Sequence, residues 1–508
     1  MAWFPRTLPW LLAALAGLGQ ALSIAAFWNG QPLWWLQLLS LAVLAAVLRR
    51  QPSWPRAALC GWLFATCWLT GTWWWLFISM HVYGGLPAPL AALAVLGLAA
   101  FLGSYYAVAA ATYWRLGRHT VLPGALVFAA AWLLAELMRG VFFTGFPWGA
   151  GGYAHVEGPL AALAPWIGVY GIGLVAALVA GLLGALDRSG QAAWRGALAV
   201  PVLLLAIVSL PTVEANQPGA RLSVALLQGN IPQEEKFQGN SGIPQALAWY
   251  AQELTQARAS LVVAPETAIP LLPRDLPEGY LDALVRRFGQ GNQAALFGMP
   301  LGSFEGGYTN SVVGLRPGAD SYRFDKHHLV PFGEFIPPLF RWFTDLMHIP
   351  LGDFNRGEVG QPSFVWQGQR LAPNVCYEDL FGEELGARFA DPASAPTIFV
   401  NVSNIGWFGD TVAIDQHLHI SRMRALEFQR PVIRATNTGA TAIIDHRGVV
   451  TRVLPRHTRG VLEGEVEGRD GLTPFARWVS AFGLAPLWIL ALAVLLAVAL
   501  AQRRRPPR

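Results

Sequence analysis

The sequence predicts a polytopic α-helical membrane domain at residues 1–215 and a soluble α/β domain at 216–475. A C-terminal membrane helix and a basic tail follow at 476–508. Hydrophobic residues make up 54% of the 508 positions and charged residues only 13%, about half the charged share of a soluble globular protein. Much of the surface must therefore face lipid. Between about residues 218 and 470 the charged residues return and the apolar runs shorten to strand length, which marks the soluble domain.

Apolar stretches long enough to cross a bilayer, which takes roughly 20 residues, recur through the first domain and once more near the C-terminus. They lie at about 8–27, 32–48, 57–79, 87–114, 121–139, 159–187, 194–212 and 482–501. We expect the first stretch to be retained as a membrane helix rather than cleaved as a signal peptide, because more spans follow it directly.

The distribution of arginine among the connecting loops predicts the orientation of these spans, because Lys and Arg concentrate on the cytoplasmic side. Arginines occupy alternate connections, namely Arg6, Arg49, Arg50, Arg56, Arg115, Arg118, Arg188, Arg195 and the C-terminal tail. The loops at 28–31 and 80–86 contain no Lys or Arg, and the loop 139–158 contains only Arg139. The region 213–481 is therefore predicted to face outward, which in a bacterium is the periplasm.

The soluble domain alternates short β-rich runs with helical patterns. Buried strands are predicted at 223–227, 261–264, 294–298, 397–400 and 432–435, helices at about 243–258, 279–289 and 415–430, and hairpin strands at 312–314 and 442–448. This alternation is typical of an α/β domain built as packed layers.

Charge and histidine content argue against two kinds of partner. The net charge of +5 is small for this length, and no basic block marks a nucleic-acid site. His327 and His328 are adjacent, and neighbouring residues of a strand point in opposite directions, so we do not expect them to bind one metal ion. No Cys/His spacing is typical of zinc, and neither a metal nor a cofactor is predicted. A pairing of Cys376 with one of these histidines stays open.

The three cysteines differ in their surroundings. Cys60 and Cys67 lie in one predicted helix, about 10 Å apart along its axis, so they cannot form a disulfide and we interpret them as packing residues. Cys376 is the only cysteine in a domain predicted to lie in an oxidising compartment, where lone thiols are normally paired or absent. It is either a buried structural residue after the strand 370–375 or a catalytic nucleophile.

Polar side chains at the ends of predicted strands favour the catalytic interpretation, because α/β folds place reactive groups there. Cys376 is followed directly by three polar residues, and Glu266 ends the strand 261–264. Lys326 is one of few lysines in the chain, which is mildly informative because arginine heavily outnumbers lysine.

The chain resembles a known family through three motifs. They are Ala264-Pro265-Glu266-Thr267, Asp325-Lys326-His327-His328 and Asn374-Val375-Cys376-Tyr377-Glu378. Together they are similar to the nitrilase superfamily, which uses a Glu-Lys-Cys triad on an αββα sandwich. The membrane spans narrow the resemblance to the bacterial apolipoprotein N-acyltransferases, in which a nitrilase-like domain is inserted between seven N-terminal helices and one C-terminal helix.

This resemblance implies roles for three sets of residues. The catalytic set is Glu266, Lys326 and Cys376, the supporting set is Glu334, Tyr377 and Glu378, and the substrate-binding set is Phe237, Arg139, Phe146 and Trp148. Phe237 occupies a position where the family commonly has Trp, so an aromatic role is expected there. Glu334 is otherwise a solvated loop carboxylate or a member of a local salt bridge.

The resemblance also implies the reaction. An acyl chain would pass from a membrane phospholipid to Cys376 as a thioester, and then to the amino group of a diacylated apolipoprotein, the final step of bacterial lipoprotein maturation. Glu266 would move the proton, while Lys326 and a backbone N–H near residue 377 would stabilise the oxyanion, with ping-pong kinetics. The implied protein is a monomer of the bacterial inner membrane with its catalytic domain on the periplasmic side.

Two other functions stay open from the sequence. A tethered nitrilase-type amidase would use water as acceptor for a small C–N substrate, although seven preceding spans are more anchoring than a tether requires. A transporter would need intramembrane charges along a path, and the spans contain few beyond Glu136. The apolar segment 335–343 is expected to contact either the bilayer edge or the core.

Overall fold

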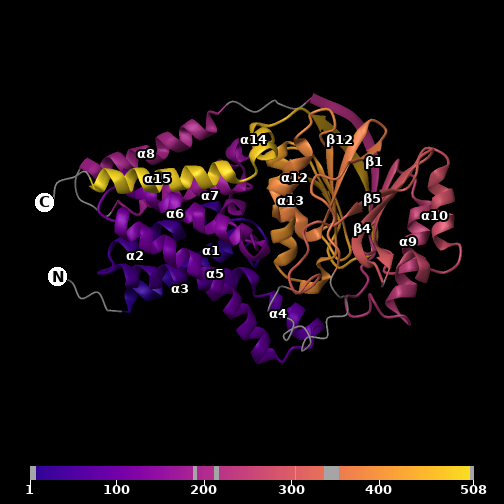
Figure 1. Cartoon of the computed structure of the whole chain (residues 1–508), viewed down its shortest axis with the longest axis horizontal. Helices are drawn as coiled ribbons and strands as arrows, with labels where there is room; N and C mark the ends of the chain where they lie inside the picture. The colour runs from indigo at the N-terminus through magenta and orange to yellow at the C-terminus, as the bar shows by residue number, and fades with distance from the viewer. Residues whose placement is uncertain (1–6, 187–190, 211–216, 304, 337–353, 504–508) are drawn as a thin grey trace. The chain divides into compact units, whose positions relative to one another are not determined.

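The computed structural model describes residues 7–186, 191–210, 217–303, 305–336 and 354–503 (Figure 1). The chain forms two compact units. The first comprises Met1–Phe77, Ala88–Thr212 and Leu484–Arg508, and the second comprises Ile78–Pro87 and Val213–Gly483. The second unit therefore takes in a short segment from the N-terminal region. The division into functional domains at 215 and 475 stays a prediction.

The first unit is helical, and a helix forms at every predicted apolar stretch. The helices are α1 (Leu8–Ile24), α2 (Trp34–Arg49), α3 (Trp54–Trp73), α5 (Ala88–Leu116), α6 (Leu122–Val141), α7 (Ala164–Leu183), α8 (Gln191–Val208) and α15 (Ala485–Arg503). By length and composition, four apolar helical segments of the described residues could cross a membrane: Ala88–Leu116, Leu122–Thr144, Pro159–Leu183 and Ala485–Arg503. The chain is thus a membrane protein in character, while the number of eight crossings stays a prediction.

Prolines help to set where these helices begin. α1, α3, α6 and α7 each have a proline in the first turn, where the missing N–H would have no helical partner in any case. Because Pro55 can occupy that turn, α3 begins at Trp54, earlier than the predicted residue 57. α3 ends at Trp73, and a short helix α4 (Leu76–Ile78) and a π-helical turn (Ser79–Tyr83) follow it.

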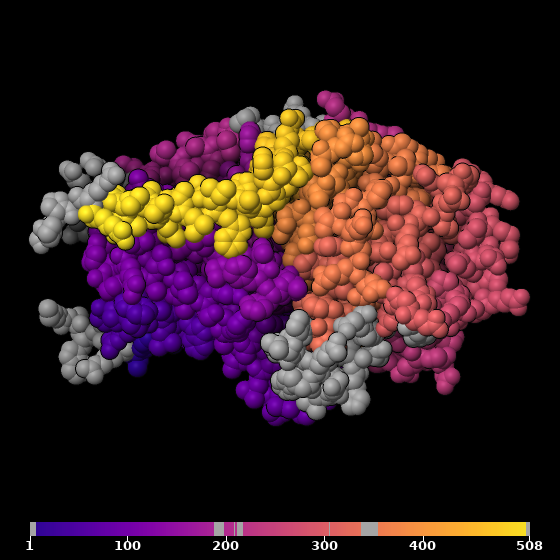
Figure 2. Space-filling view, in the orientation of Figure 1, coloured from indigo at the N-terminus to yellow at the C-terminus, as the bar shows by residue number. Residues whose placement is uncertain are grey.

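The surface of α15 is apolar, as expected for a helix in lipid. Ile489, Leu492 and Leu496 are each more than half exposed, and Figure 2 shows this yellow helix at the surface of the first unit. On its inner side, the Trp488 ring stacks on Phe142 of the turn after α6, with 6.1 Å between ring centroids.

The second unit contains two six-stranded sheets within the described residues. The first has the order β12-β1-β2-β3-β4-β5 and the second β11-β10-β9-β8-β7-β6. The strands of the first sheet are β1 (Gln217–Gln228), β2 (Leu261–Val263), β3 (Ala294–Ser303), β4 (Gly307–Leu315), β5 (Tyr322–Asp325) and β12 (Gly460–Asp470). Those of the second are β6 (Phe364–Trp366), β7 (Gln369–Val375), β8 (Ile398–Ser403), β9 (Val432–Thr436), β10 (Ala442–Ile444) and β11 (Val450–Val453).

The central strands of each sheet are parallel. β2 pairs parallel with β1 and β3, and β8 pairs parallel with β7 and β9. The helices of this unit are α9 (Gly242–Gln256), α10 (Tyr280–Gly289), α12 (Gly382–Gly386), α13 (Ala413–Phe428) and α14 (Pro474–Phe482). Parallel strands are normally covered on both faces of their sheet. Here each sheet has the other sheet on one face and helices on the other face.

Three apolar clusters hold the layers together. The central cluster joins the facing sides of the two sheets, including Leu226 and Val263 from one and Val400 and Ile433 from the other. A second cluster packs α9 and α10 on the outer face of the first sheet, and a third packs α13 and α14 on the second. The predicted αββα sandwich is therefore confirmed, together with the helical first unit.

The predicted strands and helices of this unit are all present, but four strands were not predicted from the sequence: β5, β6, β11 and β12. β12 lies at the edge of its sheet and pairs antiparallel with β1. Only Leu462, Val466 and Gly468 of β12 are buried, and Glu463 is exposed. An edge strand with one solvated face has little apolar pattern, so its run of charged residues hid it.

Candidate active site

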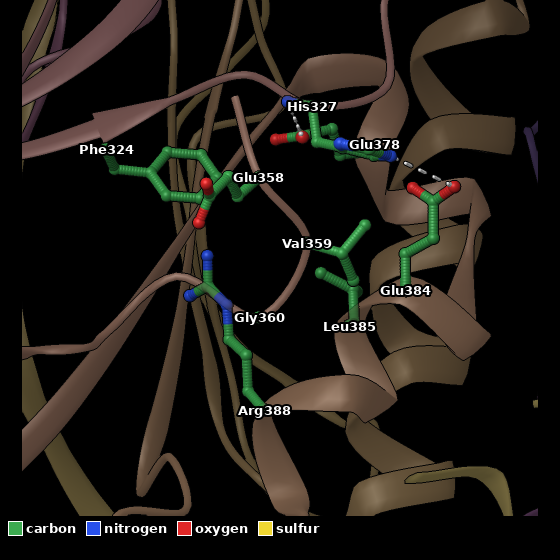
Figure 3. Close-up of a pocket in the computed structure, with 9 residues that line it drawn as sticks. All are labelled: Phe324, His327, Glu358, Val359, Gly360, Glu378, Glu384, Leu385 and Arg388. Carbon is green, nitrogen blue, oxygen red and sulfur yellow. Dashed lines mark hydrogen bonds and ion pairs between the residues drawn. The ribbon is translucent and has the colours of Figure 1, made fainter. Parts of the chain in front are cut away.

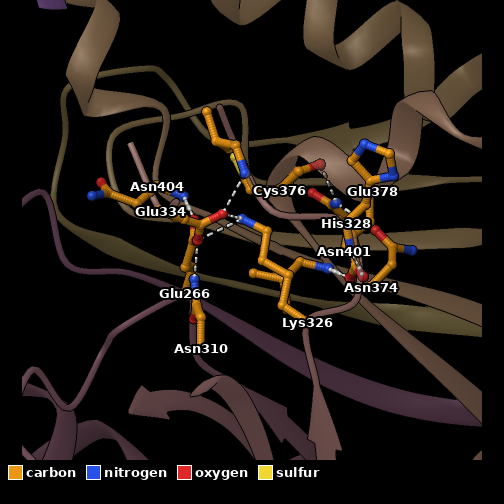
Figure 4. Close-up of polar contacts among 12 residues, drawn as sticks. Glu266, Asn310, Lys326, His328, Glu334, Asn374, Cys376, Glu378, Asn401 and Asn404 are labelled. Carbon is orange, nitrogen blue, oxygen red and sulfur yellow. Dashed lines mark hydrogen bonds and ion pairs between the residues drawn. The ribbon is translucent and has the colours of Figure 1, made fainter. Parts of the chain in front are cut away.

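The three predicted catalytic residues come together from both sheets of the second unit (Figure 4). Glu266 follows β2, Lys326 follows β5 and Cys376 follows β7. Each therefore stands just beyond the C-terminal end of a strand. Glu266 is 8% exposed and Lys326 is 1% exposed, so the electrostatic interactions among them are little screened by water.

Lys326 lies between two carboxylates. Its Nζ is 2.9 Å from the carboxylate of Glu334 and 3.4 Å from Oε1 of Glu266. Asn310 joins the same carboxylates, because its Nδ2 donates to Glu266 Oε1 at 2.7 Å and to Glu334 Oε1 at 2.8 Å. Burial lowers the pKa of Lys326, but the two carboxylates outweigh burial and the net pKa is raised. Lys326 is therefore a fixed ammonium ion.

Glu334 is part of this buried cluster and is only 9% exposed. Its Oε2 accepts a hydrogen bond of 2.8 Å from the backbone N–H of Val330, in addition to the contacts with Lys326 and Asn310. The solvated-loop interpretation of Glu334 is therefore wrong. Glu334 forms a buried salt bridge with Lys326, and its supporting role at the site stays a prediction.

Cys376 has a strained backbone, with φ of +50°. Positive φ is uncommon for residues other than Gly and clusters at functional sites. The carbonyl of Cys376 accepts hydrogen bonds from His417 Nε2 at 3.1 Å and Asn401 Nδ2 at 3.5 Å. These bonds hold the sharp turn that ends β7 and begins the 3₁₀ helix Cys376–Leu380.

The thiol of Cys376 is a poor nucleophile unless a base removes its proton. Burial and the charge of Glu266 raise its pKa, and the ammonium of Lys326 lowers it, with a net rise to about 12. The charge of Glu334 also raises the pKa of the thiol. His328 Nδ1 lies 2.9 Å from Glu384 Oε1 and His327 Nδ1 lies 2.7 Å from the Gly357 carbonyl, and these contacts do not support a pairing of Cys376 with either histidine.

Glu378 connects the loop after β5, which contains Lys326, to the turn Cys376–Leu380. Its Oε2 accepts from the backbone N–H of Val375 at 2.7 Å, and its Oε1 accepts from those of His327 at 2.7 Å and His328 at 3.2 Å. Burial raises the pKa of Glu378 to about 7, against the effect of these hydrogen bonds. Glu378 thus joins the backbone segments next to Lys326 and Cys376, and its supporting role at the site stays a prediction.

A second buried network of hydrogen bonds contacts the turn Cys376–Leu380. Asp379 is 3.4 Å from the Arg434 guanidinium and accepts a hydrogen bond from Ser421. Arg434 also donates to His417 Nδ1 at 3.0 Å. Burial and the charge of Arg434 hold the pKa of His417 well below its usual range. The neutral imidazole therefore donates from Nε2 to the Cys376 carbonyl.

The expectation that His327 and His328 point in opposite directions is wrong, because residues 326–330 are not part of a strand. Both rings lie on the same side, near Glu384. His328 Nδ1 is 2.9 Å from Glu384 Oε1 and His327 Nε2 is 4.0 Å from it. His327 Nδ1 also lies 2.7 Å from the carbonyl of Gly357.

A small polar pocket lies behind Glu378 (Figure 3). Its volume of about 20 Å³ is enough for one water molecule. It is lined by Phe324, His327, Glu358, Val359, Gly360, Glu378, Glu384, Leu385 and Arg388. The lining includes Glu378, whose carboxylate accepts hydrogen bonds from the backbone of residues 327 and 328. The pocket therefore adjoins the candidate active site.

Tyr377, the remaining predicted supporting residue, is 3% exposed. Its ring contacts those of His328, at 5.6 Å between centroids, and Phe381, at 5.3 Å. The Tyr377 side chain therefore packs against aromatic rings and is buried.

Three residues at this site were not predicted from the sequence. Asn310 bridges the two carboxylates, and the backbone N–H of Asn404 donates to Glu266 Oε2 at 2.9 Å. Lys236 is 2% exposed, and its Nζ donates to the backbone carbonyl of Glu266 at 3.0 Å. One signal could have found Lys236, because it is the only lysine besides Lys326. Asn310 lies between Thr309 and Ser311 and does not stand out in the sequence.

The predicted substrate-binding residues fall in both units. Phe237 is half-buried beside Lys236, whose Nζ is 5.9 Å from its ring centroid. In the first unit, Arg139 donates from Nη1 to the carbonyls of Phe146 at 2.7 Å and Trp148 at 2.9 Å. These bonds fasten the loop after α6, and contact of the four side chains with substrate stays a prediction. Most of the apolar segment 335–343 lies outside the described residues.

Two family models match the chain. The carbon-nitrogen hydrolase model matches residues 223–470, and the model for the apolipoprotein N-acyltransferase N-terminal domain matches residues 16–182. The αββα sandwich and the first of these matches define the second unit as a member of the carbon-nitrogen hydrolase, or nitrilase, superfamily.

Curated relatives align along almost the entire chain. An apolipoprotein N-acyltransferase from Verminephrobacter eiseniae is 61% identical, covering 95% of this chain and 94% of its own length. One from Ralstonia nicotianae is 49% identical, covering 97% and 93%. Among solved structures, a carbon-nitrogen hydrolase superfamily protein from Xanthomonas campestris is 19% identical with a TM-score of 0.37, covering 52% of this chain and 96% of its own. The chain belongs to the apolipoprotein N-acyltransferase family, and it is an acyltransferase of lipoprotein maturation.

Proposed function

We propose that Cys376 is the nucleophile, Glu266 the general base and Lys326 the oxyanion-stabilising cation of this acyltransferase. The donor is a membrane phospholipid, and the acceptor is the α-amino group of a diacylated cysteine at the N-terminus of an apolipoprotein. The observation that supports this proposal most directly is the buried Lys326 ammonium between Glu266 and Glu334, whose charges all act on the Cys376 thiol.

In the first half-reaction, the thiol attacks the acyl carbonyl of the phospholipid. Because its pKa is raised to about 12, the proton leaves during the attack, and Glu266 receives it as general base. The oxyanion of the tetrahedral intermediate forms beside Lys326, a point charge with three donors, and a backbone N–H near Tyr377 adds a further donor. Collapse breaks the C–O ester bond, Glu266 protonates the leaving alkoxide, and a thioester and a lysophospholipid result.

In the second half-reaction, the amine of the acceptor attacks the thioester carbonyl. The C–N bond forms and the C–S bond breaks. Glu266 takes the proton that the amine loses and delivers it to the sulfur, which restores the Cys376 thiol. The Glu266 carboxylate can serve in both half-reactions, because in each of them it first accepts a proton and then returns it. The expected kinetics are ping-pong, and a monomer suffices because the triad comes from one chain.

One assay tests this proposal. The purified protein receives a phospholipid with a fluorescent headgroup and a diacylated lipopeptide, and the expected products are labelled lysophospholipid and triacylated peptide. Cys376→Ala is expected to form neither. Cys67→Ala, which removes a thiol of α3, is the matched control and is expected to retain full activity.

Two results would contradict the proposal. If Cys376→Ala kept the activity of the unmodified protein, the nucleophile would be another residue. If fatty acid were released as fast without the lipopeptide as with it, water would be the acceptor, and the enzyme would act as a hydrolase.

We further propose that the second unit faces the periplasm and that the helices lie in the bacterial inner membrane. The arginines after α2 and α5 support this orientation. In a chain whose native cysteines are replaced by serine, exposed Glu463→Cys should react with a membrane-impermeant maleimide in intact spheroplasts. Exposed His119→Cys should react only after permeabilisation, and the reverse pattern would refute the orientation.

A further inference from the structure

Both lysines of this chain lie at the candidate active site. The sequence has 36 Lys and Arg residues, and only Lys236 and Lys326 are lysines. They are 2% and 1% exposed, and both approach Glu266: Lys236 Nζ is 3.0 Å from its backbone carbonyl and Lys326 Nζ is 3.4 Å from its carboxylate. Arginine cannot release its proton in a protein, whereas a buried lysine can, so lysine at position 236 allows proton transfer that arginine would not.

The two amines have opposite surroundings. Lys326 has two carboxylates within 3.4 Å and is locked as an ammonium. Lys236 forms no ion pair within the described residues, and its hydrogen bond goes to a neutral carbonyl. The titratable groups that act on it are Glu266, on the loop after β2, and Cys376, on the turn after β7. Burial outweighs their attraction and lowers the pKa of Lys236 to about 8.

The loop that contains Lys236 is fastened to the catalytic base. Asn404 donates from its backbone N–H to Glu266 Oε2 at 2.9 Å and from its side chain to Gln233 Oε1 at 2.8 Å. At the start of the loop, the backbone N–H of Ile231 donates to Asn437 Oδ1 at 3.0 Å. The amine of Lys236 is therefore held at a defined place beside the base and the nucleophile, and the half-buried Phe237 ring covers it in part.

The proton balance of the two half-reactions differs. In the first, one proton leaves the thiol and returns to the leaving alkoxide, so Glu266 alone is sufficient. In the second, the acceptor arrives as an ammonium, since an α-amino group has a pKa of about 7.7–8.0. It must lose one proton before it attacks and another as the C–N bond forms. Glu266 returns the second proton to the sulfur of Cys376, so the first needs a different acceptor, and Lys326 is already protonated.

We propose that Lys236 takes this first proton and so activates the incoming amine, an inference that rests on the proposed acyl transfer. In its deprotonated form, the amine of Lys236 accepts a proton from the acceptor ammonium, which leaves a neutral α-amine and a protonated Lys236. The neutral amine attacks the thioester, its second proton passes through Glu266 to the departing sulfur, and Lys236 then releases its proton to water.

The test separates the two half-reactions. Phospholipid without acceptor loads the enzyme, and the thioester is followed by mass spectrometry; diacylated lipopeptide is then added and thioester loss is timed. Lys236→Met and Lys236→Arg should slow this aminolysis by about 10-fold near pH 7, where only roughly a tenth of the α-amino groups are neutral without Lys236. Thioester formation should fall by no more than about 3-fold, which also shows that the variants fold. Gln238→Met, an exposed change in the same loop, is the control and should alter neither step.

A pH profile and a second nucleophile distinguish proton transfer from simple positioning. The aminolysis deficit of both Lys236 variants should shrink above about pH 9, where the α-amino group is already neutral. Hydroxylamine, which is neutral at neutral pH, should cleave their thioester at the rate of the unmodified enzyme. A deficit that is constant with pH, or equal in both half-reactions, would overturn the proposal. Failure of the unmodified enzyme to form any thioester would instead refute the proposed acyl transfer.

Discussion

The buried contact between Lys326 and Glu334 gives the sharpest prediction about this site. Glu334→Gln removes one of the two carboxylates that hold Lys326, and it does so without a change of size. Every partner of the Glu334 carboxylate is a donor: Lys326 Nζ at 2.9 Å, Asn310 Nδ2 at 2.8 Å and the Val330 N–H at 2.8 Å. An amide can offer only one acceptor oxygen, so its NH₂ group must face one of these donors.

The size of the effect follows from burial. Glu334 and Lys326 are 9% and 1% exposed, and removal of one partner from a buried ion pair costs about 3–5 kcal/mol. For a domain of this size that loss corresponds to a fall in melting temperature of about 10 °C. Lys326 would also move toward Glu266, its remaining carboxylate partner. If about 3 kcal/mol of transition-state stabilisation is lost, lysophospholipid release slows by roughly 10²-fold.

The assay compares thermal unfolding in detergent with the initial rate of lysophospholipid release. Glu465→Gln is the matched control, because Glu465 pairs with Arg221 at 3.6 Å with both side chains more than half exposed. Such surface pairs contribute about 0–1 kcal/mol, so this variant should behave like the unmodified protein. The reasoning would be refuted if Glu334→Gln unfolded and reacted like Glu465→Gln.

Three further predictions concern the Cys376 thiol, the Glu378 carboxylate and the Arg139 guanidinium. Because the pKa of Cys376 is raised to about 12, alkylation of its thiol by iodoacetamide should be slow at neutral pH and become faster as the pH rises toward that value. Lys326→Met removes the positive charge that lowers the pKa of the thiol, so alkylation of this variant should be slower still. An alkylation rate that reaches a plateau near neutral pH would contradict the raised pKa. Glu378→Gln presents an amide donor to backbone N–H groups, so thermal stability should fall by the equivalent of about 1–3 kcal/mol and acyl transfer should fall with it, whereas Glu384→Gln should affect both less. Arg139→Lys removes the guanidinium that donates from Nη1 to two carbonyls and from Nε to Tyr106. The melting temperature of the protein should therefore fall by several degrees, and an unchanged value would contradict the structural role of the loop after α6.

Sequence patterns predicted the fold well where a segment is apolar and local. Strands such as 261–264 and 432–435 and the helix 415–430 follow from runs that are buried on both faces or periodic along one face, and each was found within a few residues of its predicted ends. β12 escaped prediction because its charged residues face solvent at a sheet edge, and its pairing with β1 depends on residues about 240 positions away in sequence.

The candidate catalytic residues were predicted because each stands at the end of an apolar strand within a recognisable motif. Their partners could not be predicted in the same way. Asn310 and Lys236 have no motif of their own, and their importance comes from contacts with Glu266, from which they are separated by 44 and 30 positions. Adjacent histidines were expected to diverge, and only the irregular backbone after β5 turns both toward Glu384.

The sequence by itself determined the kinds of chemistry available to this protein. The apolar stretches require lipid around the first unit, and the motifs of Glu266, Lys326 and Cys376 supply a carboxylate, an amine and a thiol. The tertiary structure decided how those groups share protons: Lys326 is locked by two carboxylates, whereas Lys236 is buried against a carbonyl. The physical reason is that a pKa depends on distances to charges and on exclusion of water, and folding sets both by bringing distant residues together.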